Sequence, residues 1–173
     1  MMAGLDRDTL LDDVAAFVYR EARLQDEHRY AEWESLWAED GVYWVPANGD
    51  DIDPEQQMSI IYDNRSRIGV RVRQLLSGRH YSQEPRSRIR HFITNVEITR
   101  REGAEREGAG HEGAEIGVGC NVMVFESNLR GETIWAARTT YLLRRVGGDF
   151  KMARKTVALV NNDKPLYTLS FLI

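Results

Sequence analysis

Histidines are the side chains of this sequence best suited to acid–base chemistry or metal binding, and there are four: His28, His80, His91 and His111. None belongs to an HExxH motif, and CxxC, GxSxG and P-loop motifs are absent from the sequence. A Rieske iron–sulfur centre needs two cysteines and two histidines, which a chain with one cysteine cannot supply. A mononuclear iron site needs two histidines and a carboxylate that converge, and the spacing of these histidines does not indicate one.

His91 is the best candidate for acid–base catalysis. It lies between two isoleucines at alternate positions, so on a strand its side chain would point to the same side as theirs. Asp26 or Asp40 would orient the imidazole, and Tyr30 or Tyr43 would donate a hydrogen bond to a substrate. The competing interpretation is a core histidine whose hydrogen bonds are satisfied within the protein, and the sequence leaves both open.

Cys120, the single cysteine, is surrounded by apolar residues and is expected to be a small buried side chain rather than a nucleophile. One cysteine excludes an internal disulfide and fits a reducing cytoplasm. The first ten residues lack the basic region and the apolar region of a secretory signal peptide. No apolar run reaches the roughly 18 residues of a membrane span. We therefore expect a cytoplasmic protein.

The elements that must position these side chains follow from the hydrophobic spacing. Apolar residues three and four apart predict a helix that extends to Leu24, with Asp6 or Asp8 as its N-cap. They also predict a short helix over Tyr30–Trp37 and a third over Asp63–Gly78. Alternation predicts short strands at Gly41–Pro46 and Ser59–Tyr62. It also predicts four long strands, at Ser87–Thr99, Glu115–Glu126, Thr133–Arg145 and Phe150–Asn161.

Helices first and an antiparallel meander last indicate an α+β fold in which a curved sheet packs around the helices and encloses a conical interior. A length of 173 residues, 42% hydrophobic and 29% charged, fits one domain over residues 1–173. Residues 101–115 are rich in glycine and glutamate, and we expect them to form an exposed, flexible hairpin insert.

Charge is distributed unevenly along the chain. Residues 1–55 hold 15 acidic residues and 4 arginines, a net charge of −11, whereas residues 64–101 hold 10 arginines and 2 glutamates, a net charge of +8. Ion pairing within the chain and docking to another protein chain both explain this pattern. The overall charge of −4 and the lack of an aromatic–basic motif argue against nucleic acid.

Five stretches in order carry a resemblance to a known family. They are FVYREARLQDEHRYAEWESLWAEDGVYWVP, SIIYDNRSRIGVRVRQLLSG, PRSRIRHFITNVEI, KMARKTVALVNND and LSFLI. This series is similar to the small (β) subunit of aromatic-ring-hydroxylating dioxygenases, from about Leu10 to the end. The part YWVPANGDDIDPEQQMSIIYDNR resembles the branch with benzoate, toluate and anthranilate dioxygenases.

The resemblance implies the cystatin-like cone fold that nuclear transport factor 2, scytalone dehydratase and ketosteroid isomerase share. It implies a complex of three small and three large subunits, with the small subunits forming a trimer. This complex would cis-dihydroxylate an aromatic compound, for this branch an aromatic acid. The large subunit would hold the Rieske 2Fe-2S cluster and the mononuclear iron, and a reductase or ferredoxin would deliver electrons from NADH. The family assigns no catalytic, cofactor or metal residues to the small subunit.

On this interpretation, the aromatic side chains near residues 33–44 close one end of the cone. We expect these to be Trp33, Leu36, Trp37 and Trp44. The Glu, Asp and Arg residues interleaved in Tyr19–Pro46 would face outward or pair with the arginine-rich segment. The candidates for subunit contacts, chosen by residue type and clustering, are Arg65, Arg67, Arg86, Arg88, Arg90, Phe171 and Leu172. The apolar tail that holds the last two would pack either on a partner or in the chain's own core. The alternative function is a stand-alone cone-fold lyase or isomerase with His91 and an aspartate as its acid–base pair.

Overall fold

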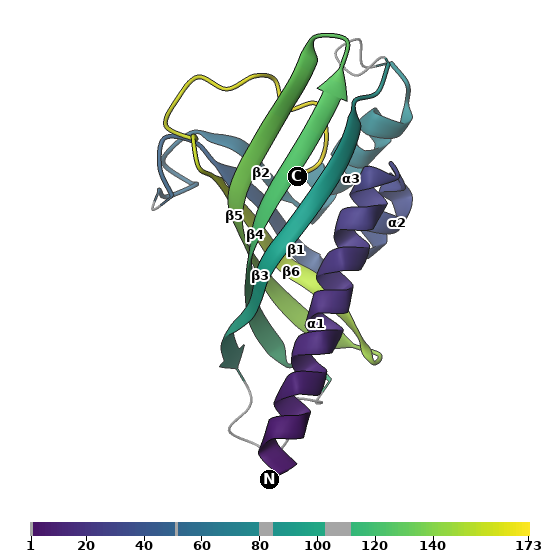
Figure 1. Ribbon diagram of the computed structural model, residues 1–173, viewed down its shortest axis with the longest axis vertical. Coiled ribbons are helices and arrows are strands. Elements are labelled where there is room, and N and C mark those ends of the chain that lie inside the picture. Colours follow the sequence, from purple (N-terminus) through teal and green to yellow (C-terminus); the bar gives the residue numbers. More distant parts are fainter. Residues whose placement is uncertain (1, 51, 80–84, 103–111) are drawn as a thin grey trace.

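The computed structural model describes residues 2–50, 52–79, 85–102 and 112–173, and the side chains of residues 9–50, 52–79, 85–100 and 112–173. Three helices pack against one side of a strongly curved six-stranded sheet (Figure 1). The helices are α1 (Met2–Asp26), α2 (Tyr30–Ser35) and α3 (Arg65–Leu76). The strands are β1 (Trp37–Pro46), β2 (Ser59–Asn64), β3 (Arg88–Glu102), β4 (Glu115–Asn128), β5 (Gly131–Val146) and β6 (Asp149–Leu159).

The sheet has the strand order β2-β1-β6-β5-β4-β3, and every neighbouring pair is antiparallel except β1 and β6. The β4–β5 and β5–β6 hairpins turn at glycines. Gly131, Gly147 and Gly148 have φ angles of 124°, 58° and 81°, which side chains with a Cβ rarely adopt. The expected α+β fold with a curved, mostly antiparallel sheet is therefore confirmed.

Helix α1 runs along β3 at one edge of the sheet (Figure 1). Its buried positions recur every three or four residues, and that spacing places them on one face toward the sheet. These positions are Leu10, Val14, Phe17, Val18, Glu21, Ala22, Leu24 and Gln25. Among the described residues, no helix is long and apolar enough to span a membrane.

Two sequence predictions of element boundaries are corrected by the structure, and a third falls on residues that the structure does not describe. Helix α1 already begins at Met2, so neither Asp6 nor Asp8 is its N-cap. Trp37 is the first residue of β1 rather than part of α2, because its backbone pairs with Met152 of β6. The flexible insert predicted at 101–115 falls largely on residues 103–111, which lie outside the described part of the chain.

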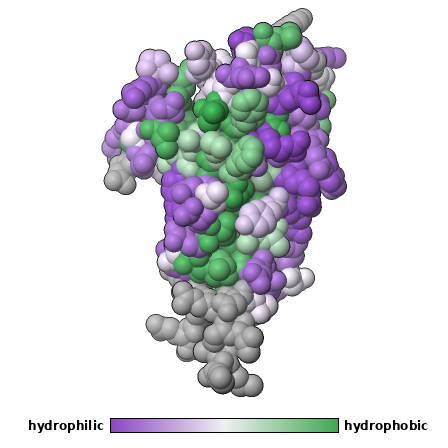
Figure 2. All heavy atoms as spheres, in the orientation of Figure 1, coloured by the Kyte–Doolittle hydropathy of each residue, from purple (hydrophilic) through white to green (hydrophobic). Residues whose placement is uncertain are grey.

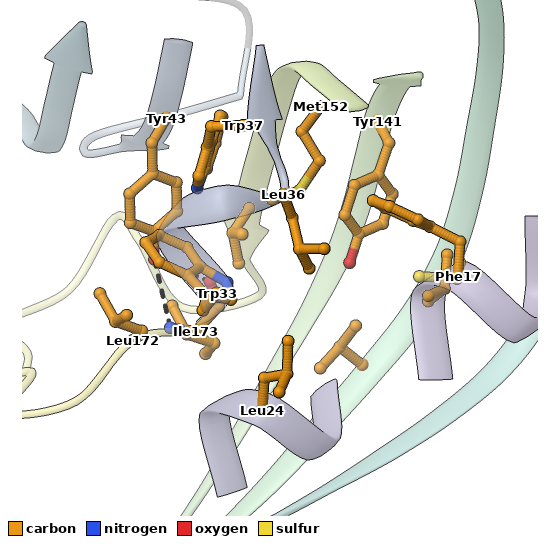
Figure 3. Close-up of a cluster of buried hydrophobic side chains, with 14 of the residues drawn as sticks. Phe17, Leu24, Trp33, Leu36, Trp37, Tyr43, Tyr141, Met152, Leu172 and Ile173 are labelled. Carbon is orange, nitrogen blue, oxygen red and sulfur yellow. Dashed lines mark hydrogen bonds between the residues drawn. The ribbon is translucent and has the colours of Figure 1, made fainter. Parts of the chain in front are cut away.

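Part of the aromatic cluster expected near residues 33–44 is buried in the interior (Figure 3). The rings of Trp33, Trp37 and Tyr43 lie 5.4–5.8 Å apart between centroids, edge to face or tilted. Trp44 was predicted to belong to this cluster, and that prediction is wrong. Successive residues of a strand face opposite sides, so Trp44 lies on the other side of β1, under the guanidinium of Arg154.

Candidate functional site

His91 and Asp26 form the pair that the sequence proposed as a catalytic dyad. The Nδ1 atom of His91 lies 2.7 Å from Oδ1 of Asp26, and the backbone N–H of His91 donates to the same carboxylate at 3.0 Å. Asp26 is the last residue of α1, and His91 lies on β3, beside which this helix packs. The other acid considered, Asp40, instead binds Arg144 at 2.8 and 3.0 Å, and this pairing lowers the pKa of Asp40.

The side chains of Asp26 and His91 are as buried as those of residues in the protein core. The side chains of His91 and Asp26 are 2% and 6% exposed, and Nε2 of His91 has no hydrogen-bond partner within the described structure. A substrate would have to reach that nitrogen for acid–base catalysis. In this conformation the two hydrogen bonds to one carboxylate join the end of α1 to β3.

The tyrosines proposed as proton donors are engaged elsewhere. Tyr30 shares a 2.6 Å hydrogen bond with Nδ1 of His28, and Tyr43 donates to the backbone carbonyl of Ile173 at 2.7 Å. Burial raises the pKa of Tyr30 to about 12 and raises that of Tyr43 as well. A phenol has a single O–H to donate, so neither tyrosine assists His91 in this arrangement.

A second polar cluster, which the sequence interpretation missed, lies inside the cone. The carboxylate of Glu21 accepts from Nζ of Lys155 at 2.7 Å, from Nε1 of Trp33 at 2.6 Å and from the hydroxyl of Tyr141 at 3.2 Å. The Lys155 and Glu21 side chains are 2% and 1% exposed. Three donors on one carboxylate satisfy a charge that is buried together with its counterion.

The expectation that the acidic residues of this stretch all face outward or pair with arginines is therefore wrong for Glu21. A signal for its burial was present in the sequence. Glu21 lies four residues after Phe17 and three after Val18, on the apolar face of α1, and Lys155 precedes Val157 at strand spacing. A charged residue in the buried phase of a helix and another in the buried phase of a strand suggest an internal pair.

A third buried carboxylate, Glu126 on β4, ties the C-terminal segment to the sheet. It accepts from the hydroxyls of Ser87 at 2.6 Å and Ser170 at 3.1 Å, from the amide of Asn128 at 2.9 Å, and from Nε1 of Trp135 at 2.9 Å. Glu126 itself is 3% exposed. Because all four donors converge on it, this carboxylate is a structural group.

The apolar tail packs in the chain's own core, which is one of the two arrangements that the sequence left open. Phe171 and Leu172 are 4% and 1% exposed, and the ring of Phe171 packs edge to face on Trp135. Figure 3 shows Leu172 and Ile173 beside the aromatic cluster, where Ile173 bonds Tyr43. The side chains of Phe171 and Leu172 are thus buried within their own chain, and only the arginines remain candidates for subunit contacts.

The first two candidate arginines are engaged within the chain. Arg65 donates to Oε1 of Glu34 at 2.8 Å, and each side chain is about one-third exposed or less. Arg67 donates to the backbone carbonyl of Tyr62 at 3.3 Å and remains exposed. These contacts fix the start of α3 and leave Arg67 in contact with solvent.

The other three candidate arginines follow one another around the start of β3. Arg86 lies with its guanidinium 6.0 Å from the ring of Tyr30. Arg88 is exposed, and Arg90 is 67% exposed, with a distant contact of 3.7 Å to Asp26. Arg88 and Arg90 therefore retain most of their hydrogen-bonding capacity at the surface.

Cys120 is fully buried on β4, and burial raises the pKa of its thiol to about 11. This burial confirms the prediction that Cys120 is a small buried side chain. A thiol with this pKa carries little thiolate, the nucleophilic form, at neutral pH. Within the described residues, no group of three or more histidine, cysteine, aspartate and glutamate side chains is arranged to hold a metal ion.

Comparison with known proteins identifies the family. The model of the ring-hydroxylating beta subunit family matches residues 20–163. The 2-halobenzoate 1,2-dioxygenase small subunit of Burkholderia cepacia is 38% identical over 94 residues, which are 51% of this chain and 57% of that subunit. The biphenyl 2,3-dioxygenase subunit beta of Rhodococcus jostii (strain RHA1) is 28% identical over 174 residues, covering 94% of this chain and 88% of the relative.

A solved structure extends the similarity to three dimensions. The beta subunit of benzoate 1,2-dioxygenase from Burkholderia mallei ATCC 23344 superposes with a TM-score of 0.70 and 28% identity, over 93% of this chain and 96% of that one. The helices and the curved sheet of the two chains thus correspond over nearly their whole length. With its α+β cone and the family model matched over residues 20–163, this chain belongs to the family of small, or beta, subunits of aromatic-ring-hydroxylating dioxygenases.

Proposed function

We propose that this chain is the non-catalytic structural subunit of a terminal oxygenase, and that it supports an iron-bearing large subunit in the cis-dihydroxylation of an aromatic compound. The observation that carries the proposal is the family match over residues 20–163 together with the fold shared with a benzoate dioxygenase beta subunit. The interior supports a structural role, because its polar groups are used to hold elements together. Glu21, Glu126 and the Asp26–His91 pair each join segments that are distant in sequence.

The donor set of this chain does not fit the cofactors of the reaction. A Rieske cluster requires two cysteine and two histidine ligands, and the single cysteine is fully buried in β4. We therefore assign the Rieske 2Fe-2S cluster and the mononuclear iron to the large subunit. We further propose three large and three small subunits in the cytoplasm, with electrons from NADH arriving through a reductase or ferredoxin.

An aromatic acid is the substrate class that we propose. Support comes from the 2-halobenzoate relative at 38% identity and from the benzoate dioxygenase subunit, whose fold matches over 93% of this chain. The biphenyl relative defines the competing class, an uncharged aromatic hydrocarbon. In the proposed complex the ring binds in the large subunit, so this chain indicates the substrate through kinship alone.

The first test is co-expression of this chain with the proteins encoded beside it, followed by mass determination and iron analysis of each co-purified chain. A complex of large and small subunits with iron only in the large chain would support the proposal. The assembled complex would then be assayed with benzoate and anthranilate, and with biphenyl and benzene as the contrasting class. A metal-free homo-oligomer without a partner would contradict the proposal.

The second candidate function is a stand-alone lyase or isomerase, and the 2.7 Å contact between Asp26 and His91 is the observation that favours it. Replacing His91 with alanine separates the two functions. In the structural role, turnover by the assembled complex stays nearly unchanged, apart from lower stability. A loss of several orders of magnitude in a stably folded complex would favour catalysis by His91.

A further inference from the structure

Residues 163–173 form a segment that crosses the outside of the molecule and then enters its interior; we call this segment the strap. It belongs to no helix or strand. Residues 163–169 are exposed or half-buried, and Tyr167 is 80% exposed. This outer part runs through the upper left of Figure 1, where Figure 2 shows mainly hydrophilic side chains. Residues 170–173 are buried, so the strap joins a part that faces solvent to a part that lies in the core.

Two anchors hold the strap in place. Just before it, Asn162 bonds the side chain of Asp50 at 2.7 Å and the backbone N–H of Asn48 at 2.8 Å. At its buried end, Ile173 accepts from the hydroxyl of Tyr43 at 2.7 Å through its carbonyl and donates to that hydroxyl at 3.2 Å through its N–H. A segment outside the ladder of strand hydrogen bonds can open while the sheet stays folded, because opening breaks only the contacts of that segment.

The buried end of the strap fills an apolar part of the cone interior. Phe171 packs edge to face on Trp135, with 5.9 Å between the ring centroids. Leu172 and Ile173 lie beside the aromatic cluster (Figure 3), and each is 1% exposed. In a protein core, an apolar cavity of about 150 Å³ is enough to bind benzene, and the side chain of Phe171 is itself built on such a ring. An open strap therefore leaves a pocket with aromatic walls.

The groups around this pocket define the class of ligand that it would take. The Tyr43 hydroxyl both donates to and accepts from the peptide group of Ile173, so it can bind a neutral group that does the same, such as an amide. A carboxylate is a poor ligand here, because an unpaired charge is costly to bury. The Lys155 ammonium lies 5.9 Å from the Tyr43 ring, but it is already bound to Glu21 at 2.7 Å. A ligand carboxylate would have to compete with Glu21 for it.

We propose that the strap opens while the rest of the fold stays intact, and that the pocket beneath it binds a small uncharged aromatic compound whose polar group both donates and accepts hydrogen bonds. Such a compound stabilises the open strap, because it occupies the pocket only when the strap has left it. The closed strap is thus an intramolecular competitor of this ligand. The inference is independent of the proposed function, since the pocket lies within this chain and its ligand differs in charge from an aromatic acid.

Thiol labelling of the full chain measures the opening. Leu172→Cys places a thiol in the strap, and Cys120 provides one in β4; these positions are 1% and 0% exposed. Each thiol reacts with a disulfide reagent only when its own segment opens. Under native conditions, we expect the thiol at position 172 to react at least about 100-fold faster than Cys120. Equal rates would overturn the proposal, because the strap would then open only together with the whole fold.

A second variant, Ile173→Cys, gives the same measurement if Leu172→Cys impairs folding. Ile173 is also 1% exposed. Circular dichroism and fast labelling of Cys120 would reveal such a folding defect, because Cys120 is reached only when the sheet unfolds. The comparison of the strap thiol with Cys120 within one molecule therefore remains decisive.

The anchoring hydrogen bonds are tested with Tyr43→Phe in the labelled variant. Loss of the hydroxyl should speed labelling at position 172 about 2- to 10-fold, as expected for the loss of a hydrogen bond. Tyr62→Phe on β2 is the matched control, because the Tyr62 hydroxyl bonds Glu55 at an exposed position, and labelling should not change. An unchanged rate in Tyr43→Phe would refute the anchoring role on which the proposal depends.

Benzamide and benzoate are the probes for the pocket, because they have the same shape and differ in charge. A ligand with a dissociation constant of about 1 mM for the open pocket would speed labelling at position 172 about 10-fold at about 10 mM, by raising the population of the open strap. We expect this from benzamide and not from benzoate, with Cys120 unaffected by both. A change of less than about twofold with benzamide, or an equal response to both compounds, would overturn the assigned ligand class.

Discussion

Replacement of Lys155 with methionine tests whether the buried ion pair stabilises the fold as its geometry implies. Methionine has a similar volume and removes the ammonium group that lies 2.7 Å from Glu21. The carboxylate would remain 1% exposed, with Trp33 and Tyr141 as its only described donors. Removing one partner of such a pair costs about 3–5 kcal/mol, because the other charge stays buried without compensation.

The double variant Glu21→Gln/Lys155→Met should be much less destabilised than Lys155→Met alone. It removes both charges and keeps an oxygen that accepts from Trp33, so we expect unfolding free energy within about 2 kcal/mol of the wild type. The double variant should therefore be more stable than Lys155→Met alone by at least about 1 kcal/mol. For a domain of this size, the single variant should lower the melting temperature by roughly 6–20 °C.

Urea unfolding followed by tryptophan fluorescence is a suitable assay, because Trp33 donates to Glu21. Lys151→Met on the same strand is the matched control. Lys151 donates to a backbone carbonyl in an exposed position, and its replacement should change stability by no more than about 0.5 kcal/mol. If Lys155→Met is as stable as this control, or if the double variant is less stable than Lys155→Met, the assigned role of the pair is wrong.

Three further predictions concern other buried groups. The thiol of Cys120 is fully buried with a pKa of about 11, so it should react with a disulfide reagent at pH 8 only after unfolding; rapid labelling of the native protein would contradict this. Burial raises the pKa of Tyr43 and Tyr141, so the folded state keeps protons that the unfolded state releases above about pH 10. Below that pH, these tyrosines should not affect the free energy of unfolding. Above it, the free energy of unfolding should fall by up to about 1.4 kcal/mol per pH unit for each tyrosine. Absorbance at 295 nm should show the tyrosines ionising together with unfolding, and ionisation before unfolding would contradict the assignment. Asp26→Asn should cost about 1–3 kcal/mol and speed hydrogen exchange at the amide of His91, since that N–H and Nδ1 both bind the carboxylate; unchanged exchange would show that the contact is not formed in solution.

The local elements of this fold could be predicted from the sequence alone. The four long strands lie within three residues of their predicted bounds, because alternating side chains and glycine turns depend on neighbouring residues. The burial of Cys120 followed from the same alternation. The family could also be named from the order of five short motifs, and the family model confirms it.

The contacts between distant segments were decided by the tertiary structure. Strand alternation predicts which side a residue faces but not which strand lies beside it, so the parallel pairing of β1 with β6 was not foreseen. The same limit applies to Lys155 and Glu21, which are 134 residues apart in sequence. Only the packing of α1 against the sheet shows that His91 meets Asp26 instead of Asp40, and only the closed cone shows that Phe171 and Leu172 are covered by their own chain. Each of these contacts depends on how two elements are placed in space. The local pattern of hydrophobic and polar residues indicates which side of its element a residue faces, but not which residue of another element it meets.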